Sequence, residues 1–137
     1  MGMEAMGSGL KTRLQTITDI KHVWAPNELP DAVNEFPAAL ILPGTTEYHQ
    51  TFGNQEEVMF RIIILMHKAN QPSALNRVSD YIDKSGTDSV YAAIDGDSTL
   101  AGAADWAVVD SNNGIGWTSW GNQNYLSTEF SVRCVKA

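Results

Sequence analysis

The stretch EVMFRIIILMH, residues 57–67, carries the strongest structural signal in the chain. Every second residue of it is apolar, whereas the residues between them are mixed. Successive side chains of a strand point to opposite faces of a sheet, so this alternation predicts a strand with one face in the core. The residues expected on the core face are Val58, Phe60, Ile62, Ile64 and Met66.

The opposite face of the same strand carries Ile63 and Leu65 beside Arg61 and His67. A sheet that meets water on one side normally has polar residues on that side. We therefore expect Ile63 and Leu65 to be covered by a helix or by another subunit, which makes them candidate interface residues.

Working outward toward the N-terminus, Leu10, Leu14 and Ile17 recur at helical spacing and predict a short amphipathic helix. Residues 1–9 contain three glycines and are expected to be disordered or only partly ordered. A short strand is predicted at 21–25. A second is predicted at 38–42, closed by a turn at Pro43 and Gly44.

Beyond the central strand the pattern changes to helical spacing. A helix is predicted from Pro72, with Leu75, Val78 and Ile82 inward, and Gly86 ends it. A second short helix is expected from an N-cap at Thr87 or Asp88 to Gly96. Its inward residues are Val90, Ala93 and Ile94.

The last third of the chain reads as an antiparallel meander. Strands are predicted at 105–110 and 115–120, with turns at 112–114 and 121–122, followed by a long strand to the C-terminus. Cys134 lies on the buried side of that last strand. The whole pattern predicts one α+β domain over 10–137, a mainly antiparallel sheet with helices packed on one face.

Composition restricts the classes of function. Sixteen acidic against nine basic residues give a net charge of -7 without a basic cluster, which argues against specific nucleic-acid binding. One cysteine permits no intrachain disulfide, and no apolar run is long enough to cross a membrane. The start lacks the pattern of a secretory signal, so a reducing compartment such as the bacterial cytoplasm is expected.

No arrangement typical of catalysis is present in the sequence. His22, His49 and His67 have no metal-binding spacing, no turn presents a nucleophile, and the glycines form no phosphate-binding loop. Asp95, Asp97 and Asp105 lack the spacing of a calcium loop and read as helix-end and loop carboxylates. We therefore expect no catalytic, cofactor-binding or metal-binding residues, and not an enzyme.

Aromatic residues provide the other candidate interface positions. Trp117 and Trp120 follow Trp106 closely in sequence, and both a core and an interface role fit them. The segment 45–55 carries Tyr48 and Phe52 and is predicted to be a loop, either one that orders on assembly through a ring or partner contact or a plain exposed loop.

Three segments resemble the small tail terminator (tail completion) proteins of long-tailed, non-contractile bacteriophages. They are FPAALILPG at 36–44, SGTDSVYAAIDGDSTLAG at 85–102 and YLSTEFSVRC at 125–134. The order of predicted elements is similar as well, so the likeness extends over most of the chain.

The resemblance implies a structural virion protein that forms a ring, usually a hexamer, in the phage tail. Its partners would be copies of itself, the major tail tube protein and the head-side connector protein, with DNA passing through the ring. It would be assembled in the host bacterial cytoplasm. Alternatives are another head-tail connector or minor tail subunit, a small-ligand-binding α+β cone using Asp105 or Glu129, and a carbohydrate-binding module using the tryptophans.

Overall fold

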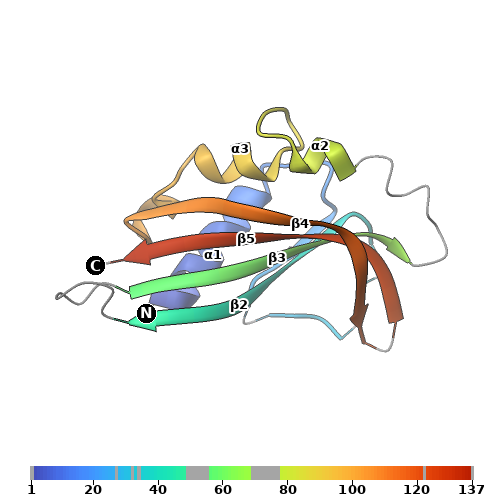
Figure 1. Cartoon of the computed structure of the whole chain (residues 1–137), viewed down its shortest axis with the longest axis horizontal. Helices are drawn as coiled ribbons and strands as arrows, with labels where there is room; N and C mark the ends of the chain where they lie inside the picture. The colour runs from blue at the N-terminus through green and yellow to red at the C-terminus, as the bar shows by residue number, and fades with distance from the viewer. Residues whose placement is uncertain are drawn as a thin grey trace.

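A computed structural model describes residues 2–26, 28–31, 33, 35–48, 56–68, 78–121 and 123–136. Five strands form one sheet in the order β1-β2-β3-β5-β4, as Figure 1 shows. Only the β1 and β2 pair is parallel. The bounds are β1 (His22–Trp24), β2 (Ala38–Tyr48), β3 (Glu56–Lys68), β4 (Trp106–Trp120) and β5 (Gln123–Lys136).

The helices lie on one face of this sheet (Figure 1). They are α1 (Gly2–Leu14), α2 (Val78–Ile82) and α3 (Val90–Asp95), followed by the short 3-10 helix η2 (Leu100–Gly102). The predicted class, α+β with a mainly antiparallel sheet and helices on one face, is confirmed.

The main core lies between the helices and this face of the sheet. All five residues that the alternation in β3 assigned to the core are buried, and Ile62 at the centre of the strand is fully inaccessible. Met6, Leu10 and Leu14 of α1 cover them from the helical layer. Tyr81 of α2 is fully buried as well, and its hydroxyl donates a hydrogen bond to Asp19.

Helix α1 begins at Gly2, within the segment 1–9 that was predicted to be disordered or only partly ordered. Met6 extends the apolar stripe of Leu10 and Leu14 by one more turn and is fully buried. Glycine is required here: a Cβ on Gly9 would lie 2.7 Å from Leu100 Cβ. Glycines that weaken an isolated helix thus allow close packing in the folded chain.

A turn at Pro43 and Gly44 was predicted to end strand β2. The strand instead continues through these residues to Tyr48. Its pairing with β3 shifts between Pro43 and Thr46, so a bulge takes up the proline. A Cβ on Gly44 would lie 2.4 Å from Met59 O, so only glycine fits where the two strands approach. The predicted loop at 45–55 is therefore a strand over 45–48, and 49–55 lie outside the described residues.

The helical segment differs from the prediction in its inward residues and its cap. In α2 the buried residues are Val78 and Tyr81, whereas Ile82 is 37% exposed. The predicted start at Pro72 and the inward Leu75 lie outside the described residues. The N-cap of α3 is Ser89, whose side chain accepts a hydrogen bond from the Ala92 amide, in place of Thr87 or Asp88.

The predicted turn at 112–114 is a bulge inside one long strand, β4. Asn112 Nδ2 donates to Thr128 Oγ1 at 2.8 Å and to the Glu129 carbonyl at 3.0 Å, both in β5. Its Oδ1 accepts from the Gly114 amide at 2.8 Å, and Gly114 has a φ of 84°. Neighbouring-strand contacts therefore convert a turn-forming sequence into a bulge, and the meander is a two-stranded hairpin.

Truncating the central core residue tests this packing. Ile62→Ala leaves a cavity under α1, and we expect it to lower the free energy of unfolding by about 2–5 kcal/mol in urea denaturation. The control is Ile115→Ala, which removes the same atoms from a side chain that is 57% exposed. Its effect should be under about 0.5 kcal/mol, and equal losses from the two variants would contradict this core assignment.

Burial raises the pKa of the Cys134 thiol from its ordinary value of 9.0 to about 12. The unfolded thiol ionises first, so the stability associated with the neutral thiol is fully present below about pH 9 and is lost as pH rises toward 12. The difference in unfolding free energy between the natural protein and Cys134→Ala should shrink by on the order of 1 kcal/mol per pH unit in that window. Parallel pH profiles for the two proteins would contradict the burial of this thiol.

Candidate assembly surface

The sheet face opposite the helices, the outer face, is divided into two halves of different chemistry. One half is a second apolar cluster formed by Val33, Ala38, Leu40, Ile63, Leu65 and Tyr125. Leu29 and Phe36, from the segment between β1 and β2, pack against this cluster. Ile63 is 2% exposed and Leu65 is fully buried, so the interface assignment of these two residues was wrong. An irregular segment of the same chain covers Ile63 and Leu65. The alternation of apolar residues in the sequence could not show which part of the chain covers them.

Polar and aromatic contacts hold this covering segment in place. Trp120 Nε1 donates to the Pro30 carbonyl at 2.8 Å, and the Tyr125 hydroxyl donates to the Val33 carbonyl at 3.4 Å. The Phe36 ring stacks on His67 with a centroid distance of 5.0 Å. The indole and phenol satisfy backbone carbonyls of the covering segment, and Trp120, predicted as a core or interface residue, packs half-buried against this cluster.

The other half of the outer face has no such cover among the described residues, and we call it the open half. It carries Met59, Arg61, Trp106, Val108, Asp110, Glu129, Ser131 and Arg133, all half-buried or exposed. Trp106 is 40% exposed. Tryptophan, methionine and arginine are the residues enriched in protein interfaces, so the composition of the open half is that of a contact surface.

Ion pairs between strands order the charged side chains of the open half. Arg61 of β3 donates from Nε and Nη2 to the two Glu129 oxygens of β5, at 3.0 and 2.9 Å. This two-point hydrogen bond raises the pKa of Arg61, so the guanidinium stays charged. Asn113 Nδ2 donates to the same carboxylate at 3.3 Å.

A second set of charges surrounds Arg133 of β5. Its Nε lies 3.1 Å from Glu57 Oε1 of β3, and its Nη2 lies 3.7 Å from Asp110 Oδ2 of β4. The Nε hydrogen nevertheless has no acceptor in hydrogen-bonding geometry within the described part of the chain. The open half is therefore a fixed pattern of alternating charge across three strands, and not a loose solvated face.

Beyond the bulge, β4 and β5 curve away from the direction of their first halves (Figure 1), and β3 continues to pair with β5 as far as Tyr125. We call residues 114–126 the distal ribbon. Its side facing the helical layer carries Ile115 and Trp117, which pair with Thr128 and Leu126 of β5. Ile115 is 57% exposed and Trp117 is 67% exposed, so the ribbon presents two large apolar side chains to solvent.

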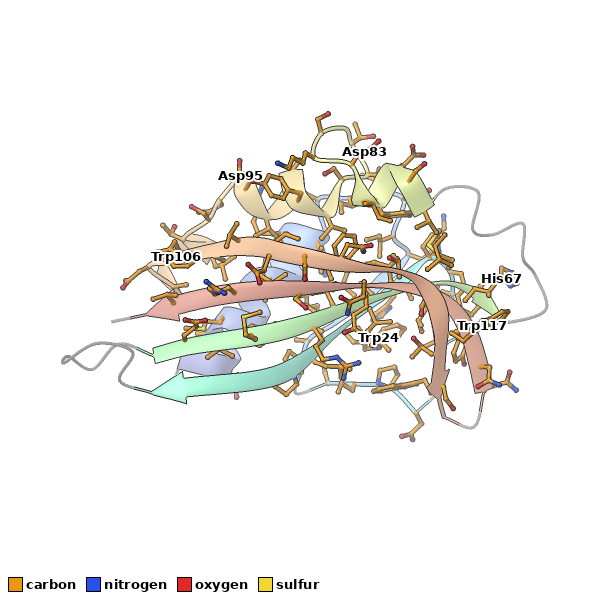
Figure 2. The ribbon with its side chains drawn as sticks, viewed as in Figure 1. Trp24, His67, Asp83, Asp95, Trp106 and Trp117 are labelled. Atoms are coloured by element: carbon orange, nitrogen blue, oxygen red, sulfur yellow. The ribbon has the colours of Figure 1, made fainter. Side chains whose placement is uncertain are left out.

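The three tryptophans that lie close in sequence are separated in the fold. Trp106 is at one end of β4 and Trp117 is near the other, as Figure 2 shows. Trp120 lies on the opposite face of the ribbon from Trp117. The tryptophans therefore form no common platform of the kind a carbohydrate-binding module uses. Of the loop aromatics, Phe52 and the side chain of Tyr48 lie outside the described residues.

The residues considered for a small-ligand site do not converge. Glu129 points to the open half and pairs with Arg61, and Asp105 is exposed. Within the described ranges, no three His, Cys, Asp or Glu side chains are grouped to hold a metal ion. No helix there is long and apolar enough to cross a membrane.

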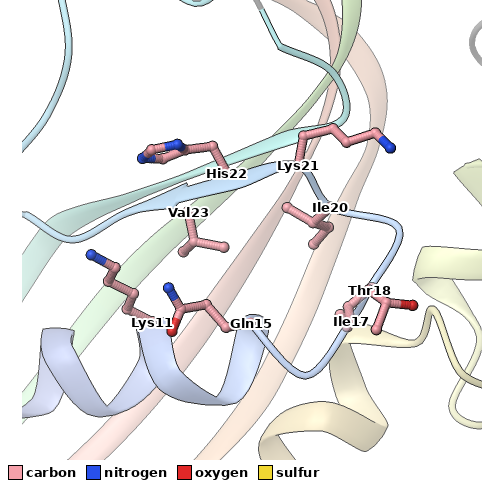
Figure 3. Close-up of a pocket in the computed structure, with 8 residues that line it drawn as sticks. All are labelled: Lys11, Gln15, Ile17, Thr18, Ile20, Lys21, His22 and Val23. Carbon is pink, nitrogen blue, oxygen red and sulfur yellow. The ribbon is translucent and has the colours of Figure 1, made fainter.

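A cleft of about 400 Å³ between α1 and β1 is lined by charged and apolar side chains (Figure 3). Lys11 is paired with Glu28, and this hydrogen bond lowers the pKa of the Glu28 carboxyl. His22 Nδ1 lies 3.8 Å from Glu35 Oε1. The Lys21 side chain extends away from that of His22 (Figure 3). The cleft is thus lined by two lysines, and the charge of one of them, Lys11, is balanced by Glu28.

Comparisons with known proteins assign no relative. No protein-family model matches the chain, and a search of curated proteins gives no significant match.

The bulge that precedes the ribbon can be tested through its asparagines. Asn112→Ala removes three hydrogen bonds of a half-buried side chain, and we expect a loss of about 1–3 kcal/mol in unfolding free energy. Asn113→Ala removes one exposed bond of 3.3 Å and should cost under about 0.5 kcal/mol. Equal effects would show that Asn112 does not hold the bulge.

Proposed function

We propose that this protein is a non-enzymatic structural subunit of a bacteriophage tail, a tail terminator that assembles into a ring. The ring, a hexamer in the resembling family, would cap the tail tube and join it to the head connector. The resemblance of residues 36–44, 85–102 and 125–134 motivates this proposal. The α+β architecture is the one that the resemblance implies.

The observation that carries the proposal is the open half of the outer sheet face. This uncovered half places Trp106, Met59 and two arginines on one face, and these residue types are enriched at protein interfaces. Trp106 is large, aromatic and 40% exposed, and such residues dominate binding energy when they become buried. The ordered Arg61 and Arg133 pairs beside it need little rearrangement on contact, which reduces the entropic cost of association.

The charge of the chain agrees with the same role. Each copy carries a net charge of -7, so a ring of copies has a strongly negative field. DNA is repelled by such a surface and can pass without being held. The major tail tube protein and the head-side connector are the partners that this role requires.

The decisive measurement is native mass spectrometry of the protein alone and with tail tube protein. We expect a closed ring, six times the 15.0 kDa subunit in the hexameric case. Trp106→Lys should prevent ring formation, because it replaces the large exposed aromatic side chain of the open half with a charge. Trp117→Lys is the matched control on the same strand and should leave the ring intact.

Failure to form any cyclic oligomer, with or without tail tube protein, would refute the ring. A ring that binds neither the tube nor the connector would favour another connector subunit over the terminator. A gene position directly before the major tail protein gene would favour the terminator.

A further inference from the structure

The outer edges of the sheet differ in how they are protected against strand addition. The β1 edge has only three residues, and Lys21 precedes it. Beyond β1, the edge of β2 contains Pro43, which has no amide donor, and a bulge before Thr46. Short length, charge, proline and bulges are the usual means of preventing edge-to-edge pairing.

The opposite edge of the sheet is β4. After the bulge, this strand has none of the features that prevent edge-to-edge pairing. Residues 114–120, GIGWTSW, contain no proline and no charged residue. Among the described residues, no backbone hydrogen bond joins this segment to anything other than β5. It is the one long edge in the described structure that is uncharged and lined by exposed apolar side chains, which is the pattern of a strand-addition site.

The register of the ribbon identifies which backbone groups face outward. Trp120 and Gln123 flank a two-residue connection and form a hydrogen-bonded pair, and such pairs alternate along an antiparallel ladder. The amide and carbonyl groups of Ile115, Trp117 and Ser119 therefore point away from β5. The same three residues have exposed side chains.

The distribution of charge allows a second copy of the chain to occupy this edge. Two copies of a chain with a net charge of -7 repel each other over most of their surfaces. An uncharged segment is where a second copy can approach without facing like charge. Asp110, the nearest acidic residue of β4, lies before the bulge and outside the segment.

We propose that residues 114–120 of β4 pair antiparallel with the same segment of a second copy, around a two-fold axis at Trp117. In this register Trp117 faces Trp117 of the second copy, and Ile115 faces its Ser119. All the outward amide and carbonyl groups of the three residues then find partners. The two sheets become one, and the two indoles form a cross-strand aromatic pair.

This pairing is a property of the free subunit and does not rest on the proposed ring. A two-fold contact uses the same segment on both copies and closes at two, whereas a cyclic ring joins two different surfaces. The two contacts also use different parts of β4, Trp106 for the ring and Trp117 for the pair.

Sedimentation equilibrium over a range of concentrations tests the pair. We expect a reversible dimer, and Trp117→Lys should raise its dissociation constant by about thirtyfold or more, because the substitution replaces an aromatic pair with like charges. Ser119→Pro, which removes an outward amide without removing a bond to β5, should weaken the dimer in the same direction. Trp106→Lys is the control and should leave the dimer unchanged.

Disulfide formation tests the register. In Trp117→Cys the two new thiols face each other, with Cα atoms about 5.5 Å apart, a separation that a disulfide spans. Ser119→Cys is the matched control, since its two copies lie more than about 13 Å apart along the paired strands. The Trp117→Cys protein should therefore form a covalent dimer under mild oxidation, and the Ser119→Cys protein should not.

Three results would overturn the inference. They are a wild-type protein that stays monomeric at every concentration, a dimer that Trp117→Lys and Ser119→Pro leave unchanged, and equal oxidation of the two cysteine variants. Circular dichroism of each variant must match the natural protein, so that loss of the dimer is not loss of the fold. Loss of the ring in Trp106→Lys with the dimer retained would separate the two contacts.

Discussion

The burial of β3 on both faces is the constraint on which the rest of the structure depends. Its helix-facing residues pack under α1, and Ile63 and Leu65 pack under the segment between β1 and β2. A strand that is apolar on both sides near its middle must be central in the sheet, with β2 and β5 on its flanks. The position of β4 at the edge follows, because β4 pairs only with β5.

The same strand also divides the outer face. The outer face of β3 is covered at Ile63 and Leu65, where the segment between β1 and β2 packs on it. At Met59 and Arg61 the same face is open to solvent. The open half is therefore available for contact with another protein, because its residues are not buried in either apolar cluster of this chain. Salt bridges pair Arg61 with Glu129 and Arg133 with Glu57 on this half.

Strand β4 shows how one element can take part in two kinds of surface. Its first half carries Trp106 and belongs to the open half of the outer face. Its second half carries Trp117 and belongs to the distal ribbon. The bulge held by Asn112 separates them and redirects the chain. Bulges occur where a strand has to change direction, so this one places two exposed tryptophans in different surroundings on one strand.

The sequence by itself determined the central strand, its core face, the α+β class and the buried Cys134, because these depend on local alternation and helical spacing. Tertiary structure decided what covers Ile63 and Leu65, and that the turn-like residues 112–114 remain within a strand. It also decided that the glycine-rich start is a helix. Each of these depends on groups distant in the chain: a covering loop, hydrogen bonds from β5, and close packing at Gly9. The sequence nominated Trp117 as a candidate interface residue, whereas the exposure of Trp106 and Trp117 depends on the folded chain.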